Sequence, residues 1–345
     1  HMDHAWIDGV TYLVNLDDET YLDAIVSTCA MTKYDMTLEN EPVAPDADRI
    51  AYAIEIKDLY GGHSGVDIGK NRANAIRAVN YCLAYAKYSG VDVTLASFAG
   101  GTAANAIPST ARAVVTFSPE YEAAFKAVME ETLAYFDKQY KNTDPDYVFT
   151  YASVEMPDRV LTRECTAKLV DLIATLREGV NTVSTRYEGI TESSFNLAIV
   201  DIDAATPIST IRYNMRTSAK WPAMLANMQM KAIADAFGAT FEDNTEGRWT
   251  PETIQIGWVE KEGDEIQELF REALKKATGD DANITAVHGG TECATFAEWR
   301  DDLQMICVGP TIVDPHSCKE TLYLDTVWKT TNAVEQLLTD IADHD

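Results

Sequence analysis

Short, β-rich apolar runs alternate with longer stretches of helical character in the first half of the chain. The runs predict strands and the longer stretches predict helices. From residue 49 their order is strand, helix, strand, strand, helix, strand, which is the order of a ferredoxin-like unit. The predicted elements are strands at 50–58, 91–99, 110–118 and 147–155 and helices near 69–88 and 119–140.

A second stretch of similar kind follows this unit. We find no residue-level repeat between the two stretches, so a second ferredoxin-like unit rests on topology alone. The sequence therefore predicts an α+β domain with one such unit and leaves the second open. Its predicted elements are helices near 163–178 and 219–237 and strands near 181–189, 194–204, 207–215 and 238–243.

The two ends of the chain have a different pattern. A lone strand at 11–16 ends in acidic residues, and the polar, proline-containing stretch 40–48 indicates a crossing between domains. A single strand needs partners, and the C-terminal segment can supply them. That segment predicts helices at about 263–277 and 325–343 and strands near 283–287 and 303–308. We therefore expect one α/β domain from residues 1–47 and 247–345, with residues 48–246 inserted into it.

Composition narrows the class of protein. A chain of 345 residues is long enough for two cores. Its formal charge of −27 disfavours nucleic acid and anionic membranes as partners. The six cysteines lack C-x-x-C spacing, which favours reduced thiols, and we find neither a signal peptide nor a long apolar run, so we expect a cytoplasmic protein. His1 and Met2 have the character of a cloning remnant, so the fold prediction excludes them.

Three of the six histidines lie in loops rich in glycine or proline, where functional side chains are common: His63, His288 and His316. His63 sits in Gly-Gly-His-Ser-Gly, between a predicted strand and a predicted helix. The glycines allow close backbone approach, so this loop can press the imidazole into a cleft. An incidental histidine in a glycine-rich turn is an equally good interpretation of this motif alone.

Asp17 and His316 each follow a predicted strand, at 11–16 and 303–308. If the two strands are parallel in one sheet, their carboxyl ends place both side chains at the crevice where α/β sheets bind ligands. One imidazole and one carboxylate make half of a zinc site, because a catalytic zinc needs three protein ligands and an open position. From spacing alone, a strand-end pair without a metal is the more frequent case.

Three further residues suit substrate recognition. Asn105 lies in a glycine-rich loop between strands, Arg216 ends a strand where its fork can bind a carboxylate, and Glu292 follows His288-Gly289-Gly290. A tight hairpin, a surface salt bridge and a helix cap are the ordinary alternatives.

Taken together, these residues resemble the aminoacyl-histidine dipeptidase branch of the co-catalytic zinc metallopeptidases, relatives of carnosinase, peptidase T and acetylornithine deacetylase. Seven blocks match in order across nearly the whole chain. They are Asn15-Leu16-Asp17-Asp18-Glu19, Gly61-Gly62-His63-Ser64-Gly65, Gly100-Gly101-Thr102 with Asn105-Ala106-Ile107-Pro108, Glu192-Ser193-Ser194, Arg216, His288-Gly289-Gly290-Thr291-Glu292-Cys293, and Gly309-Pro310-Thr311-Ile312 with Pro315-His316-Ser317.

The resemblance implies a fold and a set of roles. It implies an α/β zinc-peptidase catalytic domain split by an inserted α+β lid. Asp17 and His316 would each bind one of two zinc ions, and His63 would polarise the scissile carbonyl of a dipeptide of the Xaa-His type. Asn105 and Arg216 would hold the substrate, with Arg216 on its carboxylate; Glu292 is a further substrate-binding candidate.

The chain departs from the family in the segment that carries most of the family's catalytic and metal-binding residues. The family carries an H-x-D motif, a bridging aspartate and a Glu-Glu pair in an N-terminal segment, and no counterpart to them is found here; His1-Met2-Asp3 matches H-x-D only in its letters. We therefore expect an incomplete catalytic domain that binds zinc weakly and hydrolyses little alone. The alternatives are a non-catalytic module for peptide binding or assembly and an N-acyl amino acid deacylase; homodimerisation is left open.

Overall fold

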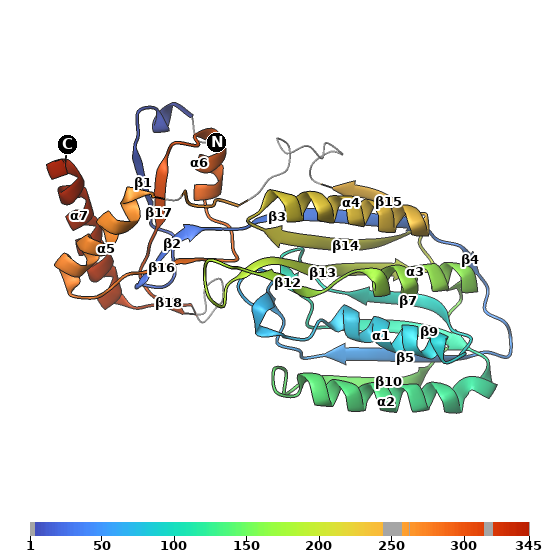
Figure 1. Cartoon of the computed structure of the whole chain (residues 1–345). Coiled ribbons are helices and arrows are strands. Elements are labelled where there is room, and N and C mark those ends of the chain that lie inside the picture. Colours follow the sequence, from blue (N-terminus) through green and yellow to red (C-terminus); the bar gives the residue numbers. More distant parts are fainter. Residues whose placement is uncertain (1–3, 244–256, 262, 314–319, 345) are drawn as a thin grey trace.

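The computed structural model describes residues 4–243, 257–261, 263–313 and 320–344, which form two parts (Figure 1). We call residues 30–243 the larger part, and residues 4–29 together with those from 257 onward the smaller part. The chain thus leaves the smaller part, builds the larger one and returns. This is the inserted arrangement that the sequence predicts.

The larger part is built on one antiparallel sheet of nine strands. The strands lie in the order β10-β5-β9-β7-β13-β14-β3-β15, and β12 pairs with β13. Their bounds are β3 Ala30–Glu39, β5 Ile50–Lys57, β7 Thr94–Gly100, β9 Ala111–Phe117, β10 Val148–Val154, β12 Gly179–Val183, β13 Thr191–Asp203, β14 Ile208–Thr217 and β15 Thr240–Asp243.

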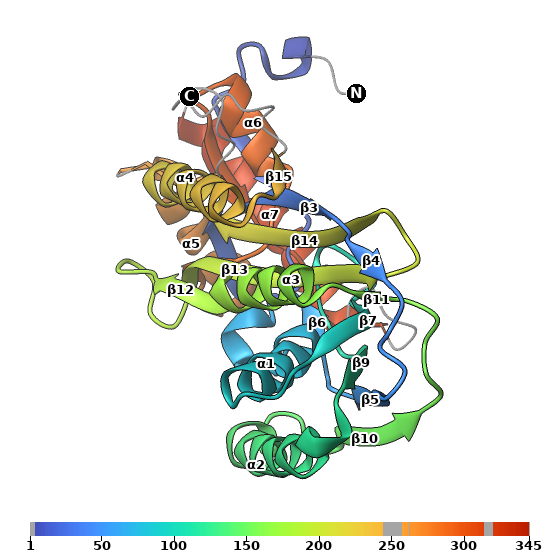
Figure 2. The ribbon, with the colours of Figure 1, turned by 90° about the vertical axis from the view of Figure 1, so that its right-hand side faces the viewer.

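Four helices cover one face of this sheet, as the side view in Figure 2 shows: α1 Ala75–Tyr88, α2 Glu122–Tyr140, α3 Arg163–Thr175 and α4 Lys220–Phe237. Alternate strand residues point to the helices, so that Tyr52, Ile54 and Ile56 of β5 are buried in the shared core. Helix starts are fixed by side-chain caps, since Asn74 accepts from Arg77 N at 3.1 Å and Thr162 accepts from Cys165 N at 3.1 Å.

The elements of the larger part follow in the predicted order, but β3 was not among the predicted strands. Residues 30–39 fall inside the segment 1–47 that we assigned to the first domain, yet β3 pairs with β14 and β15. The physical reason is visible in its pattern: Thr32, Tyr34, Met36 and Leu38 are buried at every second position. The first crossing between the parts therefore lies at Thr28–Cys29 and not at 40–48.

The smaller part has a four-stranded sheet in the order β1-β17-β2-β16. β1 and β17 are parallel neighbours, with Asn15 opposite Cys307. This confirms the strand arrangement on which the Asp17 and His316 hypothesis depends. The bounds are β1 Tyr12–Asn15, β2 Asp23–Ser27, β16 Asn283–Ala286 and β17 Gln304–Cys307, with helices α5 Glu265–Thr278, α6 Cys293–Trp299 and α7 Leu324–His344.

Helices α5 and α7 pack together and build the core of the smaller part with the sheet. Ile266, Phe270 and Leu274 of α5 and Leu337 of α7 are buried there. The remaining short elements lie in connections: η1 His4–Ile7, β4 Pro42–Val43, β6 Gly62–His63, η2 Ile68–Lys70, β8 Ala106–Ile107, η3 Pro119–Tyr121, β11 Val160–Leu161, β18 Ile312–Val313 and β19 Thr321–Leu322.

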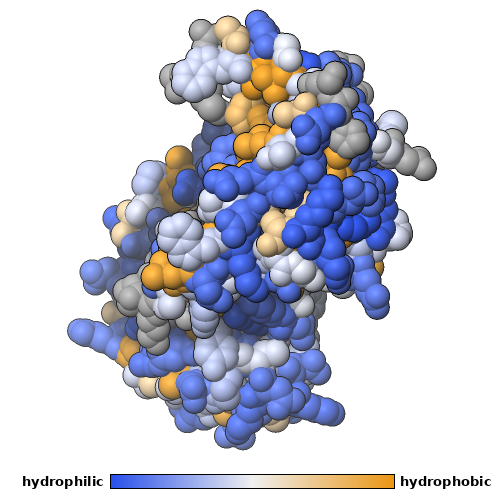
Figure 3. Space-filling model, turned by 90° about the vertical axis from the view of Figure 1, so that its left-hand side faces the viewer, coloured by the Kyte–Doolittle hydropathy of each residue, from blue (hydrophilic) through white to orange (hydrophobic). Residues whose placement is uncertain are grey.

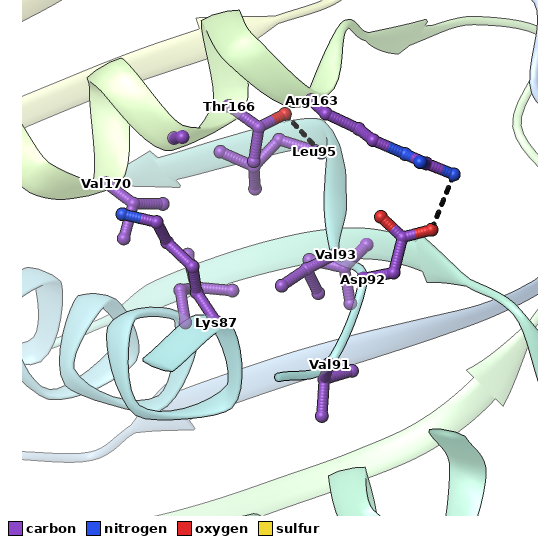
Figure 4. Close-up of a pocket in the computed structure, with 11 residues that line it drawn as sticks. Lys87, Val91, Asp92, Val93, Leu95, Arg163, Thr166 and Val170 are labelled. Carbon is purple, nitrogen blue, oxygen red and sulfur yellow. Dashed lines mark hydrogen bonds and ion pairs between the residues drawn. The ribbon is translucent and has the colours of Figure 1, made fainter. Parts of the chain in front are cut away.

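A pocket of about 210 Å³ lies in the larger part between α1, α3 and the start of β7 (Figure 4). Valine and leucine side chains fill its walls, and an ion pair of 2.7 Å between Arg163 and Asp92 lies at its edge. Every polar group labelled there has a partner, since Lys87 pairs with Asp171 and Thr166 accepts from Leu95 N. We interpret this pocket as a packing gap in the core.

On the face seen in Figure 3 hydrophilic residues predominate and hydrophobic ones form separate groups. Among the described residues, no helix is both long enough and apolar enough to cross a membrane.

Candidate active site

The glycine-rich loop around His63 is built against a second loop of the larger part. β6 pairs with β8, which places His63 opposite Ala106, and the Ser64 backbone N–H donates to the Asn105 carbonyl at 2.8 Å. Gly61 has a positive φ of 59°, and a Cβ there would lie 2.8 Å from the Ile107 carbonyl oxygen. The predicted site residues His63 and Asn105 therefore lie on neighbouring loops. The side chain of Asn105 is exposed.

Arg216 reaches the same loop from the end of β14. It is 6% exposed; its Nε donates to Ser64 Oγ at 3.3 Å, and one terminal nitrogen lies 3.2 Å from His63 Nε2. A guanidinium only donates, so His63 Nε2 accepts in this contact. Burial lowers the pKa of Arg216 from its ordinary value. These contacts involve a hydroxyl and an imidazole, so neither neutralises the positive charge.

A second polar cluster joins the two parts behind this loop. His288 of the smaller part is buried; its Nε2 lies 2.7 Å from Ser194 Oγ and its Nδ1 lies 3.1 Å from Cys29 Sγ. Ser194 is the register partner of Arg216 on the neighbouring strand. The imidazole thus links the sheet of the larger part to the crossing segment at Cys29.

Burial sets the charge of this cluster. It lowers the pKa of His288 to about 4, helped by the positive charge of Arg216. Burial also raises the pKa of the Cys29 thiol to about 12. At neutral pH the histidine is therefore uncharged and the cysteine is a protonated thiol. Cys29 is thus not an activated thiolate nucleophile.

Gly65 makes the contact between the two clusters possible. A Cβ at this position would lie 2.7 Å from the His288 carbonyl oxygen and 2.9 Å from His63 Cε1. The loop of the larger part and the loop of the smaller part therefore touch through a residue that has no side chain.

A third group lies at the carboxyl ends of β1 and β17 in the smaller part. Asn15 Nδ2 donates to Glu292 Oε2 at 3.1 Å, and both Asp17 and Glu292 are exposed. The loops after the two strands are tied together, since the Asp18 N–H donates to Val308 O at 3.4 Å. Residues 288–292 connect His288 to this group along the chain.

Asp18 is a member of this group that the sequence reading did not single out. Burial raises its pKa to about 7, with neighbouring acidic side chains adding to the effect and backbone hydrogen bonds opposing it. Its Oδ2 atom is buried and has no hydrogen-bond partner among the described residues. A Cβ at Gly309 would lie 1.8 Å from the Asp18 carbonyl oxygen, so only glycine fits there.

The described residues include some of the oxygen donors that the zinc hypothesis requires. Asp17 is exposed at the strand end, Asp18 has an unpartnered buried oxygen, and carboxylate oxygens are suitable zinc ligands. Within the described ranges, however, no three His, Cys, Asp or Glu side chains form a group that could hold a metal ion. His316 lies outside the described residues. The described residues alone do not complete a zinc site.

The structure thus brings His63, Arg216 and the Asn105 loop together and places Glu292 beside the strand that leads to Asp17. No role was predicted for Cys29, for which no local pattern gives a signal, or for Ser194, which belongs to the block Glu192-Ser193-Ser194 but was assigned no role. His288 had one, because it is among the three histidines in glycine- or proline-rich loops.

Known proteins resemble this chain in sequence and in fold. The family model described as "Peptidase dimerisation domain" matches residues 54–144. The cytosol non-specific dipeptidase of Escherichia coli (strain K12) is 23% identical over 332 residues, which cover 95% of this chain and 66% of that protein. The crystal structure of aminoacylhistidine dipeptidase from Vibrio alginolyticus matches with a TM-score of 0.83 and 25% identity, over 97% of this chain and 66% of that one.

The chain thus spans 66% of the length of both relatives and follows the fold of the second over nearly all of its own residues. The match includes both the smaller part and the inserted larger part, which carries the dimerisation-domain region. The chain is therefore similar to peptidases of the M20 family, and most of it follows the fold of an aminoacylhistidine dipeptidase.

Proposed function

We propose that this chain is the lid and part of the catalytic domain of a hydrolase that cleaves dipeptides of the Xaa-His type, such as β-alanyl-histidine. The larger part is the lid. The observation that carries the proposal is the buried Arg216, whose charge no carboxylate neutralises in the contacts described above. The likeness to aminoacylhistidine dipeptidase over 97% of the chain supports the choice of substrate.

Arg216 binds the free carboxylate of the dipeptide in this proposal. A guanidinium fork in a buried position forms strong paired hydrogen bonds with a carboxylate. Ser64 and His63 hold the fork in place before substrate arrives, so little side-chain freedom is lost on binding. A dipeptide with a blocked carboxylate would bind much less well.

His63 acts next to this clamp. It lies on the loop that touches both Arg216 and the smaller part, so its imidazole is placed to donate a hydrogen bond to the carbonyl under attack once substrate displaces the Arg216 contact. Asn105 offers an exposed amide on the neighbouring loop for the peptide backbone. Glu292, held by Asn15, offers a carboxylate for the substrate's amino group.

Zinc remains a prediction for this site. Asp17 and His316 are the residues that would hold it, and zinc would supply an activated water and a Lewis acid for the tetrahedral intermediate. Low zinc affinity and low activity of the chain alone also remain predictions.

Two further proposals concern the whole protein. A cytoplasmic location is proposed, like that in the name of the Escherichia coli relative. Homodimerisation through the region 54–144 is also proposed, and light scattering tests it.

The experiment measures zinc-supplemented hydrolysis of β-alanyl-histidine and a panel of dipeptides, each with a free and an amidated carboxyl terminus. It compares this chain with the chain joined to the N-terminal catalytic segment expected of the family. The proposal expects hydrolysis of the free acids by the extended chain. Binding of free acids without hydrolysis in either form would favour the non-catalytic peptide-binding module instead, and hydrolysis of N-acyl amino acids alone would favour a deacylase.

A further inference from the structure

A second pocket lies at the junction of the two parts, on the side of Cys29 where β2, β16 and the β12–β13 hairpin meet. Its volume is about 300 Å³, at the lower end of the range of small-molecule sites. It is lined by Ser27, Cys29, Val259, Glu260, Ala286 and Val287 of the smaller part and by residues 184–187, 190–192 and 218–220 of the larger part. None of the predicted site residues lines it.

The floor of this junction pocket is firmly built. Ser27 forms an isolated antiparallel bridge with Val259, and its carbonyl accepts from the Val287 N–H at 3.0 Å. The Glu260 N–H donates to the Val26 carbonyl at 3.0 Å. The pocket therefore rests on the ends of the sheet and not on a loose loop.

Glu260 is a buried acidic residue that lines the junction pocket. It is 7% exposed, and its Oε1 accepts from Tyr187 at 2.6 Å and from Arg186 at 2.8 Å. Its Oε2 is buried and accepts no hydrogen bond within the described part of the chain. A buried carboxylate oxygen of this kind usually has a donor, so Glu260 retains the capacity to accept one from a ligand.

The charges around the pocket are of both signs. Glu192 and Glu260 are acidic, whereas Arg186 and Lys220 are basic. Lys220 is exposed at the start of α4 and forms no ion pair with the described residues. The four charges cancel, so the pocket suits a ligand with one positive and one negative group, which the overall charge of −27 does not repel.

We propose that the junction pocket binds a free α-amino acid. Its ammonium group bonds to Glu260 and faces Glu192, its carboxylate pairs with Lys220, and its side chain packs against Ile190, Val259 and Val287. The inference rests on the proposed function for the origin of this ligand, since amino acids are the products of dipeptide hydrolysis.

The pocket shares a wall with the candidate active site. Cys29 lines the pocket and contacts His288, and Glu192 lies two residues from Ser194, the other partner of His288. A bound amino acid therefore presses on the cluster that joins the lid to the smaller part.

Isothermal titration of this chain with glycine, alanine, leucine and histidine tests the proposal, with methylammonium and acetate as single-charge probes. We expect the amino acids to bind and each single-charge probe to bind more weakly. Lys220→Met weakens binding by roughly tenfold or more, the size of a charge-assisted hydrogen bond. Lys231→Met, which removes the same charge from α4 outside the pocket, leaves the affinity unchanged.

Glu260→Gln is expected to weaken binding to a similar extent, and a thermal unfolding curve shows whether this variant folds. No binding of any amino acid to the folded wild-type chain overturns the proposal, and so does binding that Lys220→Met leaves intact. If Arg216→Lys abolishes binding while Lys220→Met does not, the amino acid occupies the candidate active site. That result rejects the junction pocket and leaves the proposed function standing.

Discussion

The buried His288 makes the stability of the protein depend on pH in a way that a single substitution isolates. Burial and the charge of Arg216 lower its pKa in the folded protein from 6.5 to about 4. In the unfolded chain this histidine takes up its proton with the ordinary pKa of 6.5. Between these two pH values the unfolded state therefore binds a proton that the folded state does not bind. The free energy of unfolding falls as the pH falls through this range.

The size of the effect follows from the lowered pKa. Each pKa unit corresponds to about 1.4 kcal/mol, so a fall from 6.5 to about 4 amounts to about 3 kcal/mol. His288 is 5% exposed, so solvent screens little of it. The stabilisation is complete above pH 6.5 and is lost as the pH falls to about 4.

The perturbation is His288→Gln, which keeps a polar side chain between Ser194 and Cys29 but cannot titrate. Urea unfolding followed by circular dichroism at a series of pH values gives the free energy of unfolding of both proteins. Other groups titrate in both, so the difference between the two curves reports His288 alone. We expect the wild type to lose about 3 kcal/mol relative to the variant between pH 6.5 and about 4. Parallel curves across this range would refute the reasoning.

Three further predictions concern the lid. Gly65→Ala should lower the free energy of unfolding by about 1–3 kcal/mol, because its Cβ would lie 2.7 Å from the His288 carbonyl oxygen. Gly289→Ala, whose Cβ meets nothing closer than 3.8 Å, is the matched control, and equal losses in the two variants would contradict the contact. Val170→Leu should raise the melting temperature by filling the 210 Å³ pocket of Figure 4, worth about 0.8 kcal/mol for one methylene, whereas Val170→Ala should lower it. In the extended chain, Arg216→Lys should reduce kcat/KM for a free dipeptide by roughly tenfold or more and change that for its amide little, since lysine keeps the charge but loses the fork. An equal loss on both substrates would assign Arg216 a structural role.

Much of the fold could be predicted from the sequence because its patterns are local. The helices and strands of residues 50–154 follow from periodicity, whereas the parallel pairing of β1 with β17 was a condition of the Asp17 and His316 hypothesis that the structure meets. β3 was missed although Tyr34, Met36 and Leu38 alternate, because the polar segment 40–48 gave a stronger boundary signal. Which sheet a strand joins depends on contacts with β14, about 180 residues away, and no local pattern records them.

In the candidate site, too, single residues could be predicted from local patterns, whereas their contacts could not. The glycine-rich loops made His63 and Asn105 candidates, and the family resemblance made Arg216 one. The contact between His63 and Arg216 could not be predicted in this way, because the two residues are 153 positions apart in the sequence. Cys29 and Ser194 contact His288 from two other segments; Cys29 lies in no motif, and the block that contains Ser194 does not indicate this contact. Buried polar clusters of this kind arise from the tertiary fold, so the sequence can name single members and cannot assemble them.

The central claim is that this lid serves dipeptide hydrolysis, and hydrolysis of β-alanyl-histidine tests it most directly. The rate is measured with zinc for this chain, for the chain joined to the expected N-terminal segment, and for Arg216→Lys in the joined chain. The account predicts hydrolysis by the joined chain, little by this chain alone, and a marked loss in the variant. Failure of the folded, zinc-loaded joined chain to cleave this or any other dipeptide would contradict it.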